Sequence, residues 1–543
     1  MEAYVHQLLQ FLDGKKQFII PIYQRPYSWT EEQCGRLWDD ILRAAETNMP
    51  THFLGSIVYV KRGLHHLTHN AQWLIIDGQQ RLTTLMLLLA ALAHVAQDQA
   101  GVTGMNPEEI RDSYLINKFG KDEDRYKLLL TQRDREILKL LIDDPDQALC
   151  QYEKSLLIDN YRFFDKRLRK DVSLEVVYEG VSKLIFVDIA LDMTYDNPQL
   201  IFESLNSTGV DLTQADLIRN YVLMSLDPQE QEWLYKEYWY PIEEKFQANN
   251  TRGSQLFDRF MRDYLSLKLE DIPRISGVYE EFKRYYQTEK SKNVSMHDLV
   301  FDIASYAEYF ARIALSHEPD PELRRAFQDI QALTVEVSYP FLLAVYDDYM
   351  RGFVRKEEFI TIVRMVESYV VRRGVCGLPT NALNKMFVSL LKEIDKQHYL
   401  ESVQAVWVSK EGNARFPKNE EFRAAFYVKD IYNNSRGNYL LQKLENHKRP
   451  VAAELESYKA VYIMPASDPL PEEWQEELGP NWKEIQARYV HTIVDTPQAR
   501  RAGILPSSSL LARRRTATTR SGRLSRSVRR DTLVGSRLPD GTL

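Results

Sequence analysis

The chain has 543 residues, of which 44% are hydrophobic and 27% charged, and its formal net charge is −7. This composition is typical of a globular protein, and the length predicts about two to four domains. The longest apolar run, Leu85–Ala93, is shorter than the roughly 20 residues that cross a bilayer, and the N-terminal residues lack a basic region followed by an apolar signal core. These features argue against a membrane or secreted protein, and we expect a cytoplasmic one.

The charge is unevenly distributed. Residues 496–543 contain eleven Arg, no Lys and two acids, a net charge of +9, so the first 495 residues sum to −16. An acidic body argues against a broad basic surface, and any nucleic-acid contact there is expected in a local groove. The three cysteines, Cys34, Cys150 and Cys376, form no metal-type pair, suit a reducing compartment and are expected in the core.

The first hundred residues predict a mixed α and β domain. Thr30 and Gln33 have the spacing of a capping box at a helix start, and Leu37, Trp38 and Ile41 then follow at helical spacing. The expected elements are a helix at 3–13, a strand at 17–23, the helix that begins at Thr30, strands at 53–60 and 73–77, and a long helix after residue 77.

The rest of the chain reads mostly as helix. Residues 105–180 are helical and strongly charged, 183–191 read as a strand, and 215–400 predict long amphipathic helices. Residues 433–438 predict a turn before a further helix. After Thr496 the chain has no aromatic residue and is rich in Ser, Arg and Thr, which predicts a disordered tail.

The pentapeptide Asp77-Gly-Gln-Gln-Arg81 lies where a strand is expected to end and a helix to begin. Free backbone amides and the helix dipole favour an anion at such a junction. Gly78 lets the backbone come close, Arg81 can fork onto phosphate oxygens, Asp77 can hold a metal ion or a sugar hydroxyl, and Gln79 or Gln80 can orient a water. The alternative is a capped helix with solvated polar residues, and the pentapeptide alone does not separate the two.

Two other segments carry polar residues in unusual settings. In 20–29, "IPIYQRPYSW", two prolines restrict a loop that can present Arg25 to a phosphate while Tyr23 or Tyr27 covers a base; taken alone, core anchoring of those aromatics is the better interpretation.

In 201–224, Thr213 and Asp216 have capping-box spacing and are expected to be structural. Asn206, Arg219 and Asn220 are candidates for function. An Arg-Asn pair in an otherwise apolar helix is costly if it is buried without an anion or carboxylate partner.

Taken together and in this order, "IPIYQRPYSW", "DGQQR" and "FESLNSTGVDLTQADLIRN" resemble the N-terminal domain of the GmrS/GmrD-type modification-dependent restriction enzymes. The resemblance implies a ParB/sulfiredoxin-like domain that binds and hydrolyses a nucleoside triphosphate, with Mg²⁺ expected and GTP, ATP and UTP not distinguished. The residues that it implies are Asp77, Gln79, Gln80 and Arg81 for catalysis, and Tyr23, Gln24, Arg25, Gly78, Asn206, Arg219 and Asn220 for nucleotide binding.

The similarity continues through residues 367–387, which resemble the family's helical linker, into a C-terminal HNH-type nuclease region. "LPEEWQEELGPNWKEIQARYVHTI" (470–493) keeps the family pattern, but "VYIMP" (461–465) stands where "EHIMP" is expected. Tyr462 therefore replaces the histidine that would activate water, and a tyrosine with a pKa near ~10 is a poor base at neutral pH. His491 remains, but the residues after Ile493 have lost the family's "GNLTL".

The arginine-rich tail begins where this match ends. A shifted reading frame explains its composition, and a basic arm that binds the DNA backbone is the alternative. We favour the frameshift, because a selected arm has no reason to begin inside a core nuclease motif.

We therefore expect an α+β protein in four parts. They are a ParB/sulfiredoxin-like domain at 1–225, a mostly helical linker at 226–414, a degraded HNH (ββα-metal-like) region at 415–495 and a tail at 496–543. The expected function is nucleotide binding and hydrolysis in a phage-defence restriction system that senses modified foreign DNA, with an inactive nuclease half. The alternatives are a nucleotide-regulated DNA-binding protein without catalysis and a purely helical scaffold; a homodimer is left open.

Overall fold

The computed structural model describes residues 2–47, 49–62, 71–99, 105–170, 172–192, 195–206, 212–247, 253–431, 433–434, 436–446 and 464–492. The chain divides into two compact units. Unit 1 comprises residues 1–258 and 275–304, and unit 2 comprises residues 259–274 and 305–543. Mostly helical structure with a single six-stranded sheet among the described residues confirms the α+β class, while the ParB-like and HNH-like details stay predictions.

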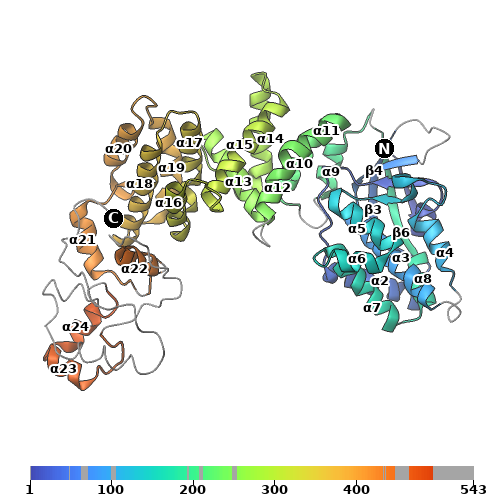
Figure 1. The fold of residues 1–543 in the computed structure, drawn as a ribbon, viewed down its shortest axis with the longest axis horizontal. Coiled ribbons are helices and arrows are strands. Elements are labelled where there is room, and N and C mark those ends of the chain that lie inside the picture. The colour runs from blue at the N-terminus through green and yellow to red at the C-terminus, as the bar shows by residue number, and fades with distance from the viewer. Residues whose placement is uncertain are drawn as a thin grey trace. The chain divides into compact units, whose positions relative to one another are not determined.

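The sheet of unit 1 has the strand order β1-β6-β3-β4-β2-β5. β1 pairs antiparallel with β6 and β4 antiparallel with β3, whereas β3–β6, β2–β4 and β2–β5 are parallel pairs. Figure 1 shows β3, β4 and β6 with helices gathered beside them. The strands are β1 (Glu2–Gln7), β2 (Lys16–Ile19), β3 (His52–Arg62), β4 (Ala71–Asp77), β5 (Leu128–Leu129) and β6 (Leu184–Leu191).

In unit 1, helices α4, α5 and α7 pack against α3, which is buried on all sides from Leu82 to Ala93. A helix that is apolar all round belongs in a core. The helices are α1 (Leu8–Leu12), α2 (Glu31–Glu46), α3 (Gln79–Asp98), α4 (Pro107–Ile110), α5 (Gln132–Asp143), α6 (Pro145–Gln151), α7 (Leu156–Lys170), α8 (Leu174–Ser182), α9 (Pro198–Asn206), α10 (Gln214–Met224), α11 (Pro228–Leu234), α12 (Tyr240–Gln247) and α14 (Val278–Ser291). α13 (Gly253–Leu269) and α15 (Met296–Ala314) are divided between the two units.

Most predicted elements of unit 1 are confirmed, including the capping box, in which the Thr30 amide donates to Gln33 Oε1 at 2.8 Å. The helix predicted at 3–13 is wrong in its first half, because residues 2–7 form edge strand β1. Its backbone pairs with β6, for example Glu2 opposite Ala190. Pairing with a strand more than 180 residues away leaves no local signal, and the exposed Tyr4 and Val5 imitate helical spacing.

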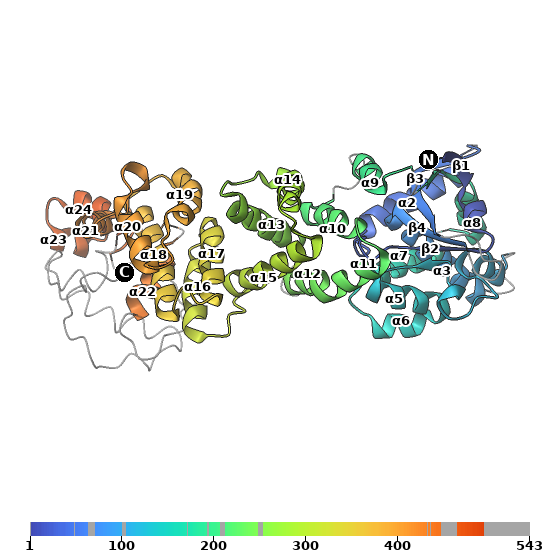
Figure 2. The same ribbon diagram turned by 90° about the horizontal axis from the view of Figure 1, so that it is seen from above.

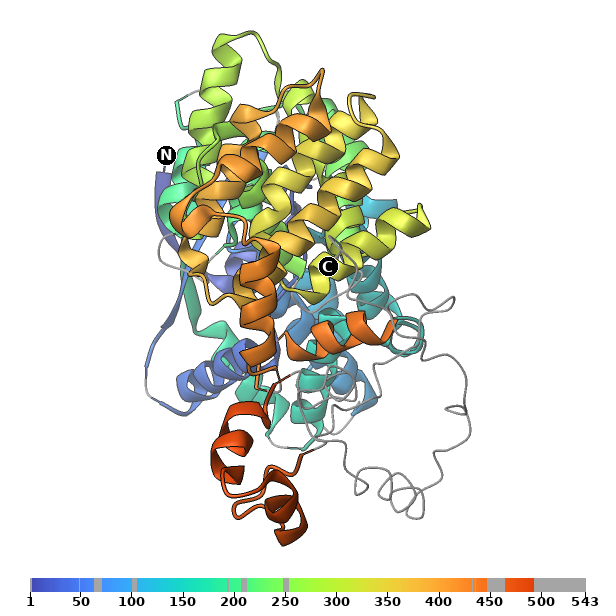
Figure 3. The same ribbon diagram turned by 90° about the vertical axis from the view of Figure 1, so that its left-hand side faces the viewer.

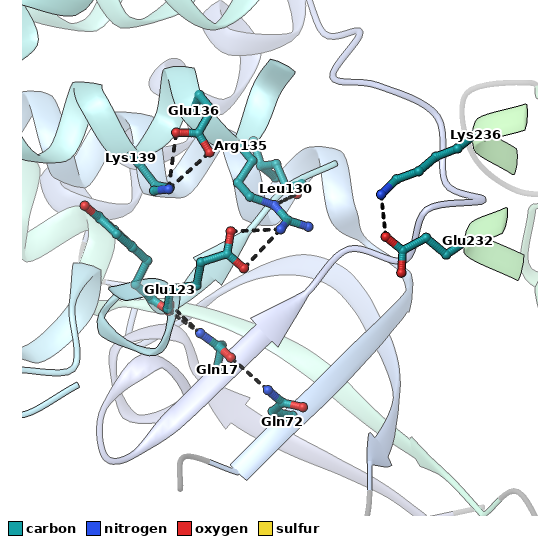
Figure 4. Close-up of polar contacts among 10 residues, drawn as sticks. Gln17, Gln72, Glu123, Leu130, Arg135, Glu136, Lys139, Glu232 and Lys236 are labelled. Carbon is teal, nitrogen blue, oxygen red and sulfur yellow. Dashed lines mark hydrogen bonds and ion pairs between the residues drawn. The ribbon is translucent and has the colours of Figure 1, made fainter. Parts of the chain in front are cut away.

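Polar side chains hold β2 and the segment around β5 together (Figure 4). Gln17, fully buried on β2, donates to the backbone oxygens of Glu123 (2.7 Å) and Tyr126 (3.1 Å) and accepts from Gln72 of β4 (3.2 Å). Arg135 of α5 donates to the Leu130 carbonyl and to the Glu123 carboxylate. These bonds satisfy groups at the end of the sheet that short β5 cannot reach.

The described secondary-structure elements of unit 2 are helices, apart from one β-bridge, and α18 contacts α16, α17, α20 and α21 (Figure 2). Tyr369 of α18 packs against Phe387, Trp407 and Phe416, so the aromatic residues of this region are core residues. The helices are α16 (Pro321–Ala332), α17 (Tyr339–Met350), α18 (Lys356–Val375), α19 (Leu383–Leu390), α20 (Tyr399–Ser409), α21 (Asn419–Val428), α22 (Gly437–Asn446), α23 (Glu472–Leu478) and α24 (Trp482–Tyr489).

Residues 464–492 have a small core of their own, made by Met464, Leu470, Trp474 and Val490. The predicted tail lies outside the described residues. The cysteine prediction is only partly right: Cys34 is buried and Cys376 half-buried, but Cys150 is exposed, because only one side of short α6 faces the core. Among the helices described, none is both long and apolar enough to traverse a bilayer.

We predict that Gly180→Ala destabilises unit 1. A Cβ at Gly180 of α8 would collide with the Ile41 carbonyl of α2, and such overpacking costs about 1–3 kcal/mol. Gly35→Ala in α2 is the matched control. A Cβ there meets only Phe163, at 3.9 Å, so this variant should be as stable as the wild type or gain up to ~1 kcal/mol. Urea unfolding measures both; equal stability of the two variants would contradict the close packing of α2 on α8.

Candidate functional site

The junction between β4 and α3 is built as the sequence predicts, with β4 ending at Asp77 and α3 beginning at Gln79. Gly78 lies between them with φ +91°, in the left-handed region. A Cβ at Gly78 would lie 3.0 Å from the Ser56 carbonyl and 3.1 Å from the Ile57 side chain. Both the backbone angle and the space therefore require glycine at this position.

Three charged side chains meet at this junction. Asp77, Arg25 and Arg81 are each half-buried. Burial raises the pKa of Asp77, although the Gly78 amide and the two guanidinium groups act against it. Burial also lowers the pKa values of Arg25 and Arg81. Asp77 is close enough to act on both arginines, and Asp216 and Arg219 also act on Arg25. Neither the carboxylate of Asp77 nor either guanidinium forms an ion pair within the part of the chain that the structure describes.

Arg81 is held against the backbone of β3. Its Nη1 donates to the Ser56 carbonyl at 2.8 Å. Its guanidinium covers Gly55, where a Cβ would lie 3.0 Å from Cζ. Gly55 has φ +116°, and the β3–β6 register shifts between Phe53 and Ser56. This irregularity in β3 makes room for the guanidinium, and a regular strand with a side chain at Gly55 would not.

Gln80 and Gln24 fasten the loop at 20–29 to the junction. Gln80 Oε1 accepts from the Ser28 amide at 2.8 Å, and its Nε2 donates to the Pro26 carbonyl at 3.2 Å. Gln24 Nε2 donates to the Ile76 carbonyl at 2.8 Å. Both amide side chains are therefore used in positioning Arg25. Gln79, in contrast, makes no side-chain hydrogen bond to any residue that the structure describes.

The two tyrosines of the loop point into the core. Tyr23 is 5% exposed and Tyr27 is 8% exposed, and burial raises both pKa values. The Tyr27 hydroxyl lies 2.6 Å from Thr84 Oγ1 and accepts from Asn160 Nδ2 at 3.0 Å. The burial of both rings agrees with core anchoring, which is the interpretation that the loop sequence favours on its own.

Arg219 of α10 is buried and fully paired. Its Nε donates to the Tyr23 carbonyl at 2.8 Å, and its other nitrogens bind the carboxylates of Asp216 (2.7 Å) and Glu243. These pairs confirm the expectation that a buried Arg219 needs carboxylate partners. Arg219 supports the loop that carries Arg25, and its guanidinium has little capacity left for a ligand.

The remaining predicted residues of α9 and α10 are less engaged. The capping box of Thr213 and Asp216 is confirmed, with the Asp216 amide donating to Thr213 Oγ1 at 3.1 Å. Asn220 is buried, and its Oδ1 has no hydrogen-bond partner within the described parts of the chain. Asn206 is the last residue of α9, and its side chain lies outside the described set.

Several residues that support the site were missed by sequence reasoning. Gly55 and Ser56 receive Arg81, Glu243 pairs with Arg219, and Asp258 of α13 accepts from the Ala215 amide at the start of α10, at 2.7 Å. Asn160 binds Tyr27 from α7. Each is distant in sequence from the motif that it supports, and only the glycine at 55 within a predicted strand was a local signal.

The predicted nuclease residues are only partly described. Tyr462 lies outside the described residues. The His491 carbonyl accepts from the Ile431 amide at 2.8 Å, and Thr492 bridges to Asp430, so this segment pairs with the residues that precede α22. No group of three or more His, Cys, Asp or Glu residues that could hold a metal occurs in the described ranges.

Comparison with known families gives a match that covers this site. Residues 8–223 match the family model described as the GmrSD restriction endonuclease, N-terminal domain. The matched range contains Arg25, the β4–α3 junction and Arg219. A comparison with curated proteins gives no match. Over residues 8–223, the chain is therefore similar to the N-terminal domain of the GmrSD restriction endonucleases.

Proposed function

We propose that unit 1 binds and hydrolyses a nucleoside triphosphate at the β4–α3 junction, and that the chain serves a restriction system directed against modified foreign DNA. One observation carries the proposal: Arg25, Arg81 and Asp77 lie half-buried at the same junction, and none of them forms an ion pair with a described residue. Partly buried charges without ion pairs lower the stability of the fold unless a bound ligand supplies the opposite charge. A triphosphate supplies the anion for both guanidinium groups, and the first amides of α3 add to it.

Each residue of the site then has a separate proposed role. Arg81, braced by the Ser56 carbonyl, and Arg25, carried on its clamped loop, hold phosphate oxygens. Gln79 is the better candidate for orienting a water, because the amide of Gln80 is already bound to Ser28 and Pro26. Gly78 allows the phosphate to approach the backbone. Tyr23, Gln24, Gln80 and Arg219 act by positioning this arrangement.

Mg²⁺ fits this donor set. The ion is commonly bound through one or two carboxylates together with substrate phosphates and water. Asp77 offers one carboxylate whose only hydrogen bond described here comes from the Gly78 amide. When bound, the ion would neutralise charge on the phosphates; Asp77 would be its protein ligand.

The nuclease half is proposed to be inactive, because Tyr462 replaces the expected base. A second candidate function is nucleotide-regulated DNA binding without hydrolysis. The same site supports this second function if Gln79 does not orient a water for attack on the triphosphate.

We predict that Arg25→Gln and Arg81→Gln each weaken triphosphate binding by at least ~10-fold, because a charged hydrogen bond contributes about 1.5–3 kcal/mol. Arg36→Gln is the control: this residue lies on α2, its side chain is 73% exposed, and it pairs only with Glu32. Isothermal titration with Mg²⁺ and each triphosphate gives the affinities. Wild-type affinity in both site variants would place the nucleotide elsewhere or exclude it.

We predict that Asp77→Asn abolishes metal-dependent hydrolysis and yet melts at a higher temperature than the wild type at neutral pH. Because burial raises the pKa of Asp77, the ionised form costs stability above that pKa. The advantage of the variant should vanish as the pH falls through the folded pKa towards the ordinary value of ~4, where the wild-type carboxyl becomes neutral. Thermal melts across this range test it. A lower melting temperature at neutral pH would show that the two arginines stabilise the ionised form of Asp77 more than burial destabilises it.

We predict phosphate release without DNA cleavage. Full-length protein with Mg²⁺ or Mn²⁺ and each triphosphate is incubated with plasmid, unmodified or carrying glucosylated bases, and nicking and phosphate are followed in the same tubes. Nicking that depends on the nucleotide would contradict the inactive nuclease, and His491→Ala then tests whether His491 supplies the base. Triphosphate binding without phosphate release would favour the second candidate function.

A further inference from the structure

Arg436 of unit 2 has an unusual environment. It precedes α22, and its guanidinium lies over Gly374 near the end of α18, where a Cβ would be 2.8 Å from Nη1. The side chain is partly buried, and burial alone lowers its pKa, with no carboxylate acting on it. It has no hydrogen-bond or ion-pair partner for its guanidinium among the residues described.

Other inward-facing arginines of unit 2 differ from Arg436. Arg364 pairs with Asp329 and Glu367, and Arg373 donates to the carbonyls of Asn413 and Pro379. A partly buried guanidinium without such partners is destabilising by an amount that can reach several kcal/mol. Among the described residues, Arg436 therefore lacks the counter-charge that a bound anion would supply.

The anchoring of α22 does not depend on Arg436. Lys443 of α22 forms ion pairs with Asp329 (2.7 Å) and Glu367 (2.9 Å), and the Tyr439 hydroxyl donates to Glu367 at 2.5 Å. These contacts fix α22 on α16 and α18. The position of Arg436 is thus maintained by its neighbours in the helix, which leaves its guanidinium available for a ligand.

A pocket of about 380 Å³ lies close to this arginine, because Val375, which follows Gly374, and Asn434 both line it. Figure 3 shows the ribbons of α21 and α22, in orange, near each other. The lining of the pocket includes Val375, Lys429, Asn433 and Asn434, and Asn434 Oδ1 accepts from the Arg436 amide at 2.9 Å. Lys429 has no ion pair with any described residue. The carboxylate in the lining, Asp430, accepts from the Asn433 amide and side chain, both at 2.9 Å.

We propose that Arg436 and Lys429, with the side-chain amide of Asn434, form an anion site that binds a phosphate of the DNA backbone. Guanidinium, ammonium and amide donors are the groups that proteins direct at backbone phosphates. The site is in unit 2 and shares no residue with the β4–α3 junction. It rests on the proposed function only in assigning the phosphate to DNA.

Its location also suits a polymer rather than a small ligand. Tyr427 (39% exposed) and Val428 (55% exposed) lie in the same segment as Lys429, so the surface next to the pocket is accessible. Because the first 495 residues have a net charge of −16, two neighbouring cations that have no ion pair with a described residue are the kind of local contact expected in an acidic protein that binds DNA.

The test uses full-length protein and a short fluorescent DNA duplex, with anisotropy measured as the salt concentration is raised. Arg436→Gln should weaken binding and reduce the slope of log K against log salt by about 0.9, the value for one lost phosphate contact. Lys429→Gln should change the slope in the same direction. Arg355→Gln is the matched control: its side chain is 79% exposed at the start of α18 and pairs with Glu358, so its loss should leave DNA binding unchanged.

Two further measurements separate the outcomes. Arg436→Gln should melt at or above the wild-type temperature, because an uncompensated charge is removed, whereas a structural arginine would lower it. Phosphate release by unit 1 without DNA should not change, so failure of the nucleotide proposal is visible separately. The inference is overturned if the wild type binds no DNA or if Arg436→Gln binds it with unaltered affinity and slope. It is also overturned if Arg436→Gln weakens only the binding of inorganic phosphate or of free triphosphate and leaves DNA binding unaltered.

Discussion

The complete burial of α3 is the constraint on which the candidate site depends. Six leucines of this helix are buried, and each contributes roughly 1.5–3 kcal/mol when removed from water. This gain outweighs the several kcal/mol that partly buried, unpaired charges at its N-terminus can cost. The helix therefore fixes where Asp77 and Arg81 lie. At position 78, glycine is the only residue type that can join α3 to β4 so close to the backbone of β3. The site is held by packing and not by attraction between its own charges.

The polar residues around α3 fall into two groups with different physical states. Gln24, Gln80 and Arg219 have their side-chain donors engaged with backbone oxygens or carboxylates, so they carry the loop that presents Arg25. Gln79 and the three charged groups at the junction still have side-chain donors or acceptors without a described hydrogen-bond partner. A single sequence motif thus contains both scaffold and candidate chemistry, and adjacent glutamines have opposite assignments because successive residues of a helix face different directions.

The sequence was sufficient where the determinants are local. Both predicted capping boxes, strands β2, β3, β4 and β6, and the strand–glycine–helix form of the junction follow from patterns within a few residues. It was insufficient where the partner is distant. β1 is a strand because β6 lies beside it, and the Arg81 guanidinium has space because β3 is irregular at Gly55. The charged residues of "DGQQR" can be recognised in the sequence. Only the fold shows that Gln80 is hydrogen-bonded to the loop at 20–29 while Gln79 is not.

The same reasoning connects Arg436 with Arg25, although they belong to different units. The chain has 77 acidic and 70 basic side chains, so carboxylates are plentiful, and most arginines described in both units have found one or a backbone oxygen. Random placement in an acidic protein favours pairing. A half-buried guanidinium that stays unpaired is therefore a feature of its position and not of composition, and an anion from outside the chain is the simplest group that restores the balance.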